Sequence, residues 1–407
     1  MEYYLPRDCQ YTMKFNMRIH LNRFLVIDIR LFFIIFALNA CVTNVEQLKA
    51  PAIDPDKPIK VAVLAPFGSK EKKLAYIGRS LRDAALLAKQ DLGTSNLDLI
   101  IYDTGEWEDH STGPVDSAIT DGANFILGPF LPEKVESIST FSKQAGVKII
   151  TFTDDITVAK NGVFILGDNP INRAEKLVQY AVKKNKYRLG IISAIKDSQS
   201  DLENSIRTIV RENGGTVTFS VYYPDKISNL SNVAEDLRQK VTSSHTDAVI
   251  FTDSPNKRIP LIAADLTDMI NSGSESRLQI IGLTRWDLES SIMLEPALAG
   301  SWLAVPDNRF RKVYEEKFLK KFGYRPHLSS NLAYDAVAAM GVLIQKRSIT
   351  KSLHRLNNKE LTNINGFIGV DGIFRFKPDG RIEKELSIVE VKKGRTNILK
   401  PAANKFP

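Results

Sequence analysis

Cysteine is almost absent from this chain of 407 residues, which contains only Cys9 and Cys41. Two thiols cannot form the disulfide framework of a small secreted scaffold, and a chain of this length does not need one. Cleavage before Cys41, argued below, leaves a single thiol, which excludes dithiol redox catalysis and thiolate metal sites. The remaining histidines are not at helical ligand spacing, so we expect no metal site: His110, His245, His327 and His354.

The sequence motifs of common enzyme classes are also missing. No H-E-x-x-H, G-x-S-x-G or G-x-x-x-x-G-K-[ST] occurs anywhere in the chain. No G-x-G-x-x-G follows the first predicted strand, which argues against a dinucleotide cofactor. The adjacent acids Asp154 and Asp155 have no nucleophile or metal ligand beside them in the sequence, so we interpret them as binding or structural residues. We therefore expect no catalytic activity and no cofactor.

Long hydrophobic runs are absent as well. The apolar run at residues 31–38 has eight residues, far fewer than the roughly 20 that a spanning helix needs. Basic residues precede it, and a small residue, Ala40, ends the segment that follows it. A basic region, a short apolar core and a small residue predict a secretory signal peptide over residues 1–40.

Leu38-Asn39-Ala40-Cys41 resembles the lipobox of bacterial lipoproteins. The resemblance implies that Cys41 becomes the lipid-bearing first residue, and residues 41–58, with three prolines, then form a tether. An ordinary cleaved signal or a signal anchor with an incidental cysteine is the alternative. With a lipid anchor, the chain is expected on the periplasmic face of the cell envelope, at the outer rather than the inner membrane.

Charge of one sign is not concentrated. The net charge of +8 is modest for 407 residues, and the basic pairs are scattered without interleaved aromatic residues. A nucleic-acid-binding surface gathers Lys and Arg on one face. We therefore expect no nucleic-acid partner.

Short apolar runs alternate with segments of helical periodicity from residue 60 onward. The runs at 60–65, 97–103, 124–127 and 147–152 are separated by amphipathic segments, and the alternation resumes over 174–282. This pattern indicates βαβ units and parallel sheets. The sequence therefore predicts an α/β protein with two doubly wound, Rossmann-like lobes.

Several motifs then resemble the type I periplasmic binding proteins, the leucine/isoleucine/valine-binding family. They are Gly128-Pro129, Tyr334-Asp335-Ala336, the Gly-rich stretch 366–372 and Pro378-Asp379-Gly380. The resemblance implies two lobes with a hinge of three crossovers, so that each lobe is discontinuous in sequence. We expect an N-terminal lobe of residues 59–170 plus 285–375 and a C-terminal lobe of residues 171–284 plus 376–400.

A narrower resemblance rests on three stretches, 121–129, 162–167 and 300–306. They are similar to the lipoproteins called penicillin-binding protein activators, which stimulate peptidoglycan synthases. This resemblance implies a non-catalytic interaction protein whose partner is a peptidoglycan synthase. The wider family implies the alternative, a solute receptor that delivers an amino acid or amine to an ABC permease. The irregular stretch Trp107–Pro114 is our candidate for a partner-binding loop.

A ligand cleft is expected where parallel strands end, because ligands of open α/β sheets bind beyond the carboxyl ends of the strands. That rule selects Phe67, Phe130, Thr151, Thr153, Asp154, Asp155, Ser193, Thr252, Asp253, Thr284 and Trp286. The resemblance places Pro132 where amino-acid receptors carry a hydroxyl for the substrate carboxylate, and a proline offers neither hydroxyl nor N–H. The alternative is that the selected residues only cap helices and pack the hinge.

Overall fold

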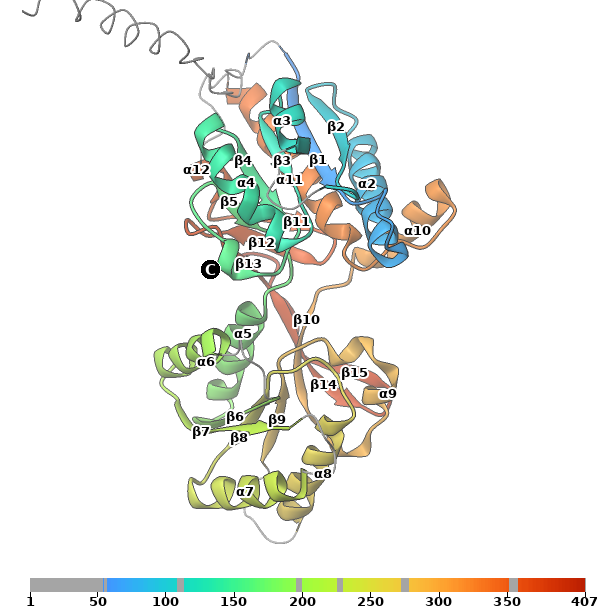
Figure 1. Cartoon of the computed structure of the whole chain (residues 1–407). Helices are drawn as coiled ribbons and strands as arrows, with labels where there is room; N and C mark the ends of the chain where they lie inside the picture. The colour runs from blue at the N-terminus through green and yellow to red at the C-terminus, as the bar shows by residue number, and fades with distance from the viewer. Residues whose placement is uncertain are drawn as a thin grey trace, which may run out of the picture. The chain divides into compact units, whose positions relative to one another are not determined.

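The computed structural model describes residue 54 and residues 57–107, 113–194, 200–224, 230–271, 278–350 and 358–406. The predicted signal peptide, Cys41 and nearly all of the tether lie outside these residues. The described chain is an α/β protein, as the sequence predicts, with one parallel sheet, one mostly parallel sheet and one small antiparallel sheet (Figure 1). No helix within the described ranges combines the length and hydrophobicity that crossing a membrane requires.

The first lobe is built on a five-stranded parallel sheet. Across the sheet, the strands are β2 (Leu97–Asp103), β1 (Ile59–Ala65), β3 (Phe125–Leu127), β4 (Lys148–Thr151) and β5 (Val163–Ile165). Its helices are α2 (Lys72–Leu92), α3 (Gly113–Thr120) and α4 (Pro132–Ala145), with the short 3-10 turn η1 (Ile156–Val158). The interior strand β1 is buried at six of its seven positions, because helices cover both faces of a parallel sheet.

The second lobe is built on a seven-stranded sheet. Across this sheet, the strands are β15 (Arg395–Lys400), β14 (Leu386–Lys392), β10 (Trp302–Pro306), β9 (Gln279–Gly282), β8 (Ala248–Phe251), β6 (Arg188–Ala194) and β7 (Thr216–Tyr223). Its helical elements are α5 (Pro170–Lys183), α6 (Ser200–Glu212), α7 (Leu230–Ser243), α8 (Arg258–Asn271), η3 (Trp286–Leu288), α9 (Ser290–Met293) and η4 (Pro296–Leu298). Only β14 and β15 are antiparallel to their neighbours.

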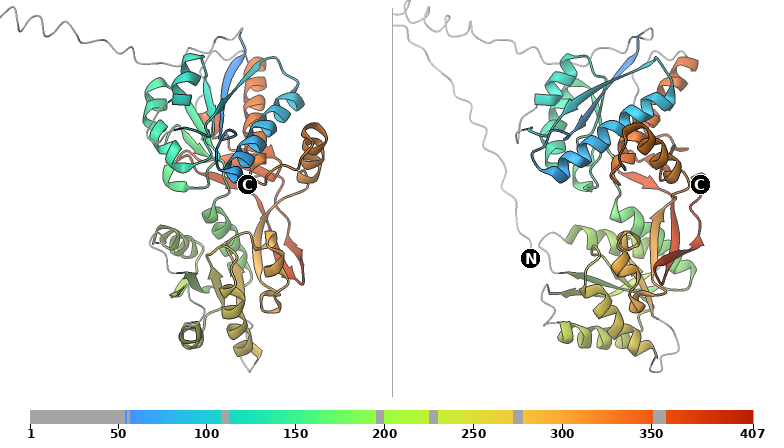
Figure 2. Two further views of the ribbon diagram at one scale, coloured as in Figure 1. Left: turned by 45° about the vertical axis from the view of Figure 1, so that its right-hand side comes forward. Right: turned by 90° about the vertical axis from the view of Figure 1, so that its right-hand side faces the viewer.

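A C-terminal segment completes the first lobe. It consists of α10 (Arg311–Phe322), α11 (Ser330–Thr350), α12 (Asn358–Leu361), β11 (Phe367–Gly369), β12 (Gly372–Phe376) and β13 (Ile382–Lys384). Helix α11 lies beside α2, and two views show this pairing (Figures 1 and 2). Gly341 of α11 allows this approach, because a Cβ there would lie 2.5 Å from Leu92.

Two of the predicted lobe boundaries are wrong. We assigned residues 285–306 to the N-terminal lobe, but β10 pairs with β9 and β14 of the second sheet. We assigned residues 376–384 to the C-terminal lobe, but β13 pairs with β12, and Ile382 lies in the core of the first lobe. Both errors arise because an apolar strand has the same pattern in either sheet. The chain therefore crosses between the sheets near residues 166–169, 307–310 and 385.

The residues after β15 return to the first lobe. Phe406 is buried, and the Arg375 guanidinium lies 4.4 Å from the centre of its ring. Arg309, in the second crossover, donates a hydrogen bond to Asn404 at 2.6 Å. Residues 401–406 thus form a fourth connection between the second sheet and the first lobe.

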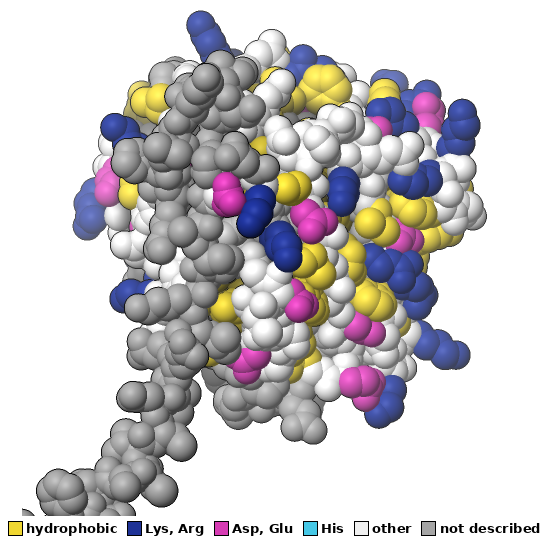
Figure 3. Space-filling model, turned by 90° about the horizontal axis from the view of Figure 1, so that it is seen from above, with side chains coloured by type: hydrophobic (Ala, Val, Ile, Leu, Met, Phe, Trp, Pro, Cys, Tyr) yellow, Lys and Arg dark blue, Asp and Glu magenta, His cyan; other side chains and the backbone are white. Residues whose placement is uncertain are grey.

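The surface of the first lobe carries mixed charge. On the face in Figure 3, Lys and Arg side chains lie among Asp and Glu side chains and apolar ones. A nucleic-acid-binding protein concentrates its basic side chains in one patch. On this face, the basic side chains are interspersed with acidic ones and do not form a single patch.

Candidate ligand site

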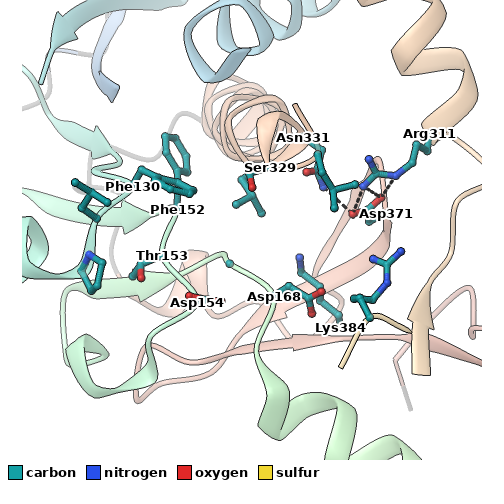
Figure 4. Close-up of a pocket in the computed structure, with 16 residues that line it drawn as sticks. Phe130, Phe152, Thr153, Asp154, Asp168, Arg311, Ser329, Asn331, Asp371 and Lys384 are labelled. Atoms are coloured by element: carbon teal, nitrogen blue, oxygen red, sulfur yellow. Dashed lines mark hydrogen bonds and ion pairs between the residues drawn. The ribbon is translucent and has the colours of Figure 1, made fainter. Parts of the chain in front are cut away.

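A cavity of about 230 Å³ lies beyond the carboxyl ends of β3 and β4, next to the crossovers (Figure 4). One end is apolar and is lined by Phe130, Leu131, Pro132, Phe152, Leu328 and Leu332. The other end is charged and is lined by Asp168, Arg285, Arg311, Asp371 and Lys384; Asp154 lies between Thr153 and Asp168 (Figure 4). The cavity therefore offers an apolar wall and an ionic wall to one small molecule.

The apolar wall is positioned by the turn after β3. Gly128 has φ 99°, and a Cβ there would lie 2.3 Å from the Leu64 carbonyl oxygen, so this position requires glycine. The Thr151 hydroxyl donates to the Pro129 carbonyl at 2.7 Å and fixes the turn against β4. Pro132 is the first residue of α4 and lines the cavity without a hydroxyl, as the sequence indicates. This wall therefore has no hydroxyl for a substrate carboxylate at that position.

The ionic wall contains a buried pair between Arg311 and Asp371. Arg311 begins α10, directly after the second crossover, and its Nε donates to Asp371 Oδ1 at 2.9 Å while Nη2 donates to Oδ2 at 2.6 Å. Asn331 of α11 also donates to Asp371, at 2.8 Å. All three side chains line the cavity, and the charges of the arginine and the carboxylate neutralise each other.

Two further arginines are paired in the same way. Arg285 donates through Nε and Nη2 to the two carboxylate oxygens of Asp287, at 2.7 Å each. Arg173, in the first turn of α5, donates to Asp168 in the first crossover. Burial lowers the pKa of Arg173 to about 10, with the nearby Arg285 as the second cause. Each arginine around the cavity thus has its own carboxylate.

Lys384 differs from these arginines. It ends β13 beside the third crossover and is only 6% exposed. Its backbone N–H donates to Asn172 Oδ1 at 3.2 Å, and its carbonyl accepts from Asn172 Nδ2 at 3.0 Å, so α5 holds its backbone from both sides. Burial lowers the pKa of its ammonium group. Among the described residues, no carboxylate lies within ion-pair distance of that ammonium.

Asp335 lies behind the ionic wall and belongs to the Tyr-Asp-Ala motif of α11. It is buried and accepts a hydrogen bond from the Val370 N–H at 2.8 Å. A Cβ on Gly369 would lie 2.4 Å from its carboxylate, so this motif and the Gly-rich stretch interlock. Burial, together with the nearby Asp371, raises the pKa of Asp335 to about 7. The motif that carries the resemblance therefore has an architectural function in this chain.

The structure brings only part of the predicted cleft together. Phe130, Thr153 and Asp154 line the cavity. Thr151 is fully buried and fixes the turn, whereas Asp155 caps η1 by accepting from the Thr157 N–H at 2.9 Å. Phe67 packs against the core of the first lobe, below the Arg82 guanidinium. Half of these first-lobe predictions have structural contacts that account for them.

The predicted residues of the second lobe do not line this cavity. Ser193 and Thr252 hydrogen-bond each other at 2.7 Å, and Asp253 accepts from the Ala194 N–H at 2.6 Å. Thr284 donates to the Asp253 carbonyl at 2.7 Å, and Trp286 is fully buried in the core. These hydroxyls and this carboxylate tie the strand ends of the second sheet together.

Sequence reasoning missed most of the ionic wall, namely Asp168, Arg311, Asp371 and Lys384, together with the adjoining Asn331. The strand-end rule selects residues within one sheet, whereas these residues come mainly from the crossovers and from the returning C-terminal segment. The signal that could have found them is charge next to a predicted crossover, such as Lys384-Glu385 before an apolar strand.

Trp107 also differs from the expectation. It is only 8% exposed and packs in the core beside α3 and α4, with the Lys134 ammonium donating to its carbonyl at 2.8 Å. A buried indole cannot anchor a protein partner from the surface, so Trp107 does not serve as the predicted contact. Residues 108–112 of the same stretch lie outside the described residues.

Comparisons with known proteins agree with this architecture. The uncharacterized protein RP748 of Rickettsia prowazekii is 20% identical over 371 residues, which are 89% of this chain and 94% of that protein. A structure from Rhodospirillum rubrum, assigned as a branched-chain amino acid ABC transporter protein, has a TM-score of 0.68 at 17% identity and covers 84% of this chain and 100% of its own.

The C-domain of LpoA from Haemophilus influenzae, described as a regulator of PBP1A, has a TM-score of 0.62 at 16% identity. It covers 84% of this chain and 99% of its own. At these identities, the likeness to both structures is one of fold. The family model described as periplasmic binding protein matches residues 58–396, and the chain therefore belongs to the periplasmic binding protein family.

Proposed function

We propose that this chain is a non-catalytic interaction protein of the cell envelope, of the penicillin-binding protein activator type. Its place is the periplasmic face of the envelope, on a lipid anchor at Cys41, and its partner is a peptidoglycan synthase. The observation that carries the proposal is that the polar groups predicted to bind a ligand are already engaged within the protein or are missing. Ser193, Thr252 and Asp253 bond one another or the backbone, and Pro132 provides no hydroxyl.

Two further findings support this reading. Stretches 121–129, 162–167 and 300–306 are similar to the activator branch. The LpoA C-domain, a regulator of PBP1A, shares the fold over 84% of this chain. A protein partner covers about 800 Å² on each side, far more than a cavity of about 230 Å³ can present. The contact with a synthase is therefore expected on the outer surface of a lobe.

The test is reconstitution with a peptidoglycan synthase of the same cell. The full chain, extracted in mild detergent, is added to the synthase, and the rate of glycan polymerisation is measured. We expect stimulation, and we expect the variant Asp154→Ala/Asp155→Ala to retain it. Absence of both stimulation and co-purification with any synthase would contradict the proposal. Loss of stimulation in this variant, with its melting temperature intact, would mean that the cavity controls the activity.

The second candidate function is a solute receptor for an ABC permease. The observation that favours it is the cavity itself, because a purely structural junction has no need of an open space lined by ionised groups. The two candidates differ in what they bind in solution. A receptor is saturated by its small ligand and associates with a permease, whereas an activator associates with the synthase in the absence of any ligand.

A further inference from the structure

Lys384 is the one cation in the described wall of the cavity that has no carboxylate partner. Arg285 and Arg311, the other lining cations, each hold a carboxylate through two or more hydrogen bonds. Lys384 has the least exposure of the three, and its hydrogen bonds to the described residues are those of its backbone. The arginines are thus neutralised by the protein, and the charge of Lys384 is not.

The side chain of Lys384 lines the cavity and points into it (Figure 4). Its backbone cannot turn away, because Asn172 holds both its N–H and its carbonyl. Burial disfavours the positive charge at this place; Asp371 and Asp335 attract it from beyond ion-pair distance, and the neighbouring cations Arg173 and Arg311 repel it. An anion that entered the cavity would therefore meet a fixed ammonium group that the folded chain leaves without a counterion.

The nearby carboxylates of Asp371 and Asp335 attract the Lys384 ammonium, but neither forms an ion pair with it, and both have other partners. Asp371 is shared by Arg311 and Asn331, and Asp335 binds the Val370 N–H and has a pKa raised by its burial. Burying an ammonium without a partner is unfavourable by several kcal/mol, and proteins normally pair such charges. A ligand carboxylate at Lys384 would complete the pairing that the other cations of the wall already have.

The opposite wall defines the rest of the ligand. Phe130, Phe152 and Leu328 offer apolar surface, which favours a hydrocarbon body. Asp154, which also lines the cavity, disfavours a second negative charge on the ligand. We propose that the cavity binds a small apolar monocarboxylic acid, with its carboxylate on Lys384 and its hydrocarbon body against the phenylalanines. This inference goes beyond the proposed interaction with a synthase and does not depend on it.

The experiment compares a carboxylic acid with its uncharged amide. The full chain in mild detergent is titrated with 3-methylbutanoate or 3-methylbutanamide, and heat of binding and melting temperature are recorded. These two probes share one hydrocarbon body and differ only in charge. We expect saturable binding and a raised melting temperature with the acid alone. Equal effects of acid and amide, or no effect of either, would overturn the proposal without requiring any variant.

Three variants assign the effect to one ammonium group. Lys384→Met is expected to weaken binding of the acid by at least about tenfold, because a charge-assisted hydrogen bond is lost. Lys384→Arg should retain part of the affinity, and Lys312→Met, on the exposed face of α10, should retain all of it. Undiminished affinity in Lys384→Met would overturn the proposal.

The melting temperature of unliganded Lys384→Met is a separate readout. A lysine that only stabilises the fold would lower the melting temperature when it is replaced. If Lys384 serves a ligand instead, its replacement should leave the melting temperature unchanged or raise it, because an unpaired buried charge is removed. A clear loss of stability together with unchanged binding of the acid would assign Lys384 a purely structural role.

Discussion

The buried carboxyl of Asp335 makes a specific prediction about the pH dependence of folding. Its pKa is raised from 3.8 to about 7, first by burial and then by the nearby Asp371. An acid whose pKa is higher in the folded chain keeps its proton up to a higher pH when the chain is folded. Between pH 4 and pH 7, the folded chain therefore binds more protons than the unfolded chain, and its stability falls as the pH rises.

The size of this effect follows from the two pKa values. Because each pKa unit corresponds to about 1.4 kcal/mol, Asp335 lowers the free energy of unfolding by about 4 kcal/mol between pH 4 and pH 8. The variant Asp335→Asn does not titrate, and its amide oxygen can still accept from the Val370 N–H. Relative to the native chain, it should become more stable by about this amount across that pH range.

The assay is urea unfolding of both chains at pH 4.5, 6, 7 and 8. Burial also lowers the pKa of the neighbouring Lys384, which affects stability with the opposite sign; because Lys384 is present in both chains, the comparison between the native chain and Asp335→Asn isolates Asp335. Glu316→Gln, which removes an exposed carboxylate on α10, is the control and should follow the native profile. If the difference between native chain and Asp335→Asn is the same at every pH, the reasoning about Asp335 is refuted.

Three other predictions concern the ionic wall, the predicted lipid anchor at Cys41 and amino-acid binding. Arg311→Met should destabilise the fold by about 3–5 kcal/mol in urea unfolding, because the buried Asp371 loses its cation and keeps only the hydrogen bond from Asn331. Adding Asp371→Leu should recover part of that loss, and a double variant as unstable as the sum of both single variants would contradict this. Cys41→Ser should move the protein from the membrane to the soluble periplasmic fraction, since stable attachment needs the acyl chains; unchanged fractionation, with no lipid mass on the N-terminal peptide, counts against the anchor. Leucine, isoleucine and valine should not raise the melting temperature, although a ligand at 100 times its Kd would stabilise the fold by about 2.7 kcal/mol; a clear shift would restore the amino-acid receptor.

The fold was largely predictable from the sequence because it depends on periodicity. The buried run of β1 and the amphipathic spacing of α2 indicate a βαβ unit without further information. The assignment of strands to sheets was less predictable. Trp302 and Ile382 are apolar residues that would fit the core of either lobe. Only the pairing of their strands shows the sheet to which each belongs.

The site was predictable only where it follows strand ends. Phe130, Thr153 and Asp154 lie after β3 and β4, and the general rule for open sheets finds them. Lys384 and Arg311 reach the same cavity from residues more than 150 positions further along the chain. No local pattern links these two groups, because their proximity is created by the crossovers. Sequence spacing therefore misses the charged half of the cavity.

Residues 401–406 also affect how the two lobes unfold. They follow β15 of the second sheet but contact the first lobe and the second crossover: the Phe406 ring packs under Arg375, and Asn404 accepts a hydrogen bond from Arg309. Unfolding of either lobe therefore breaks contacts that stabilise the other lobe, which favours a single calorimetric transition. A chain shortened after Lys400 keeps both sheets but loses this mechanical coupling, so its two lobes become freer to melt at separate temperatures.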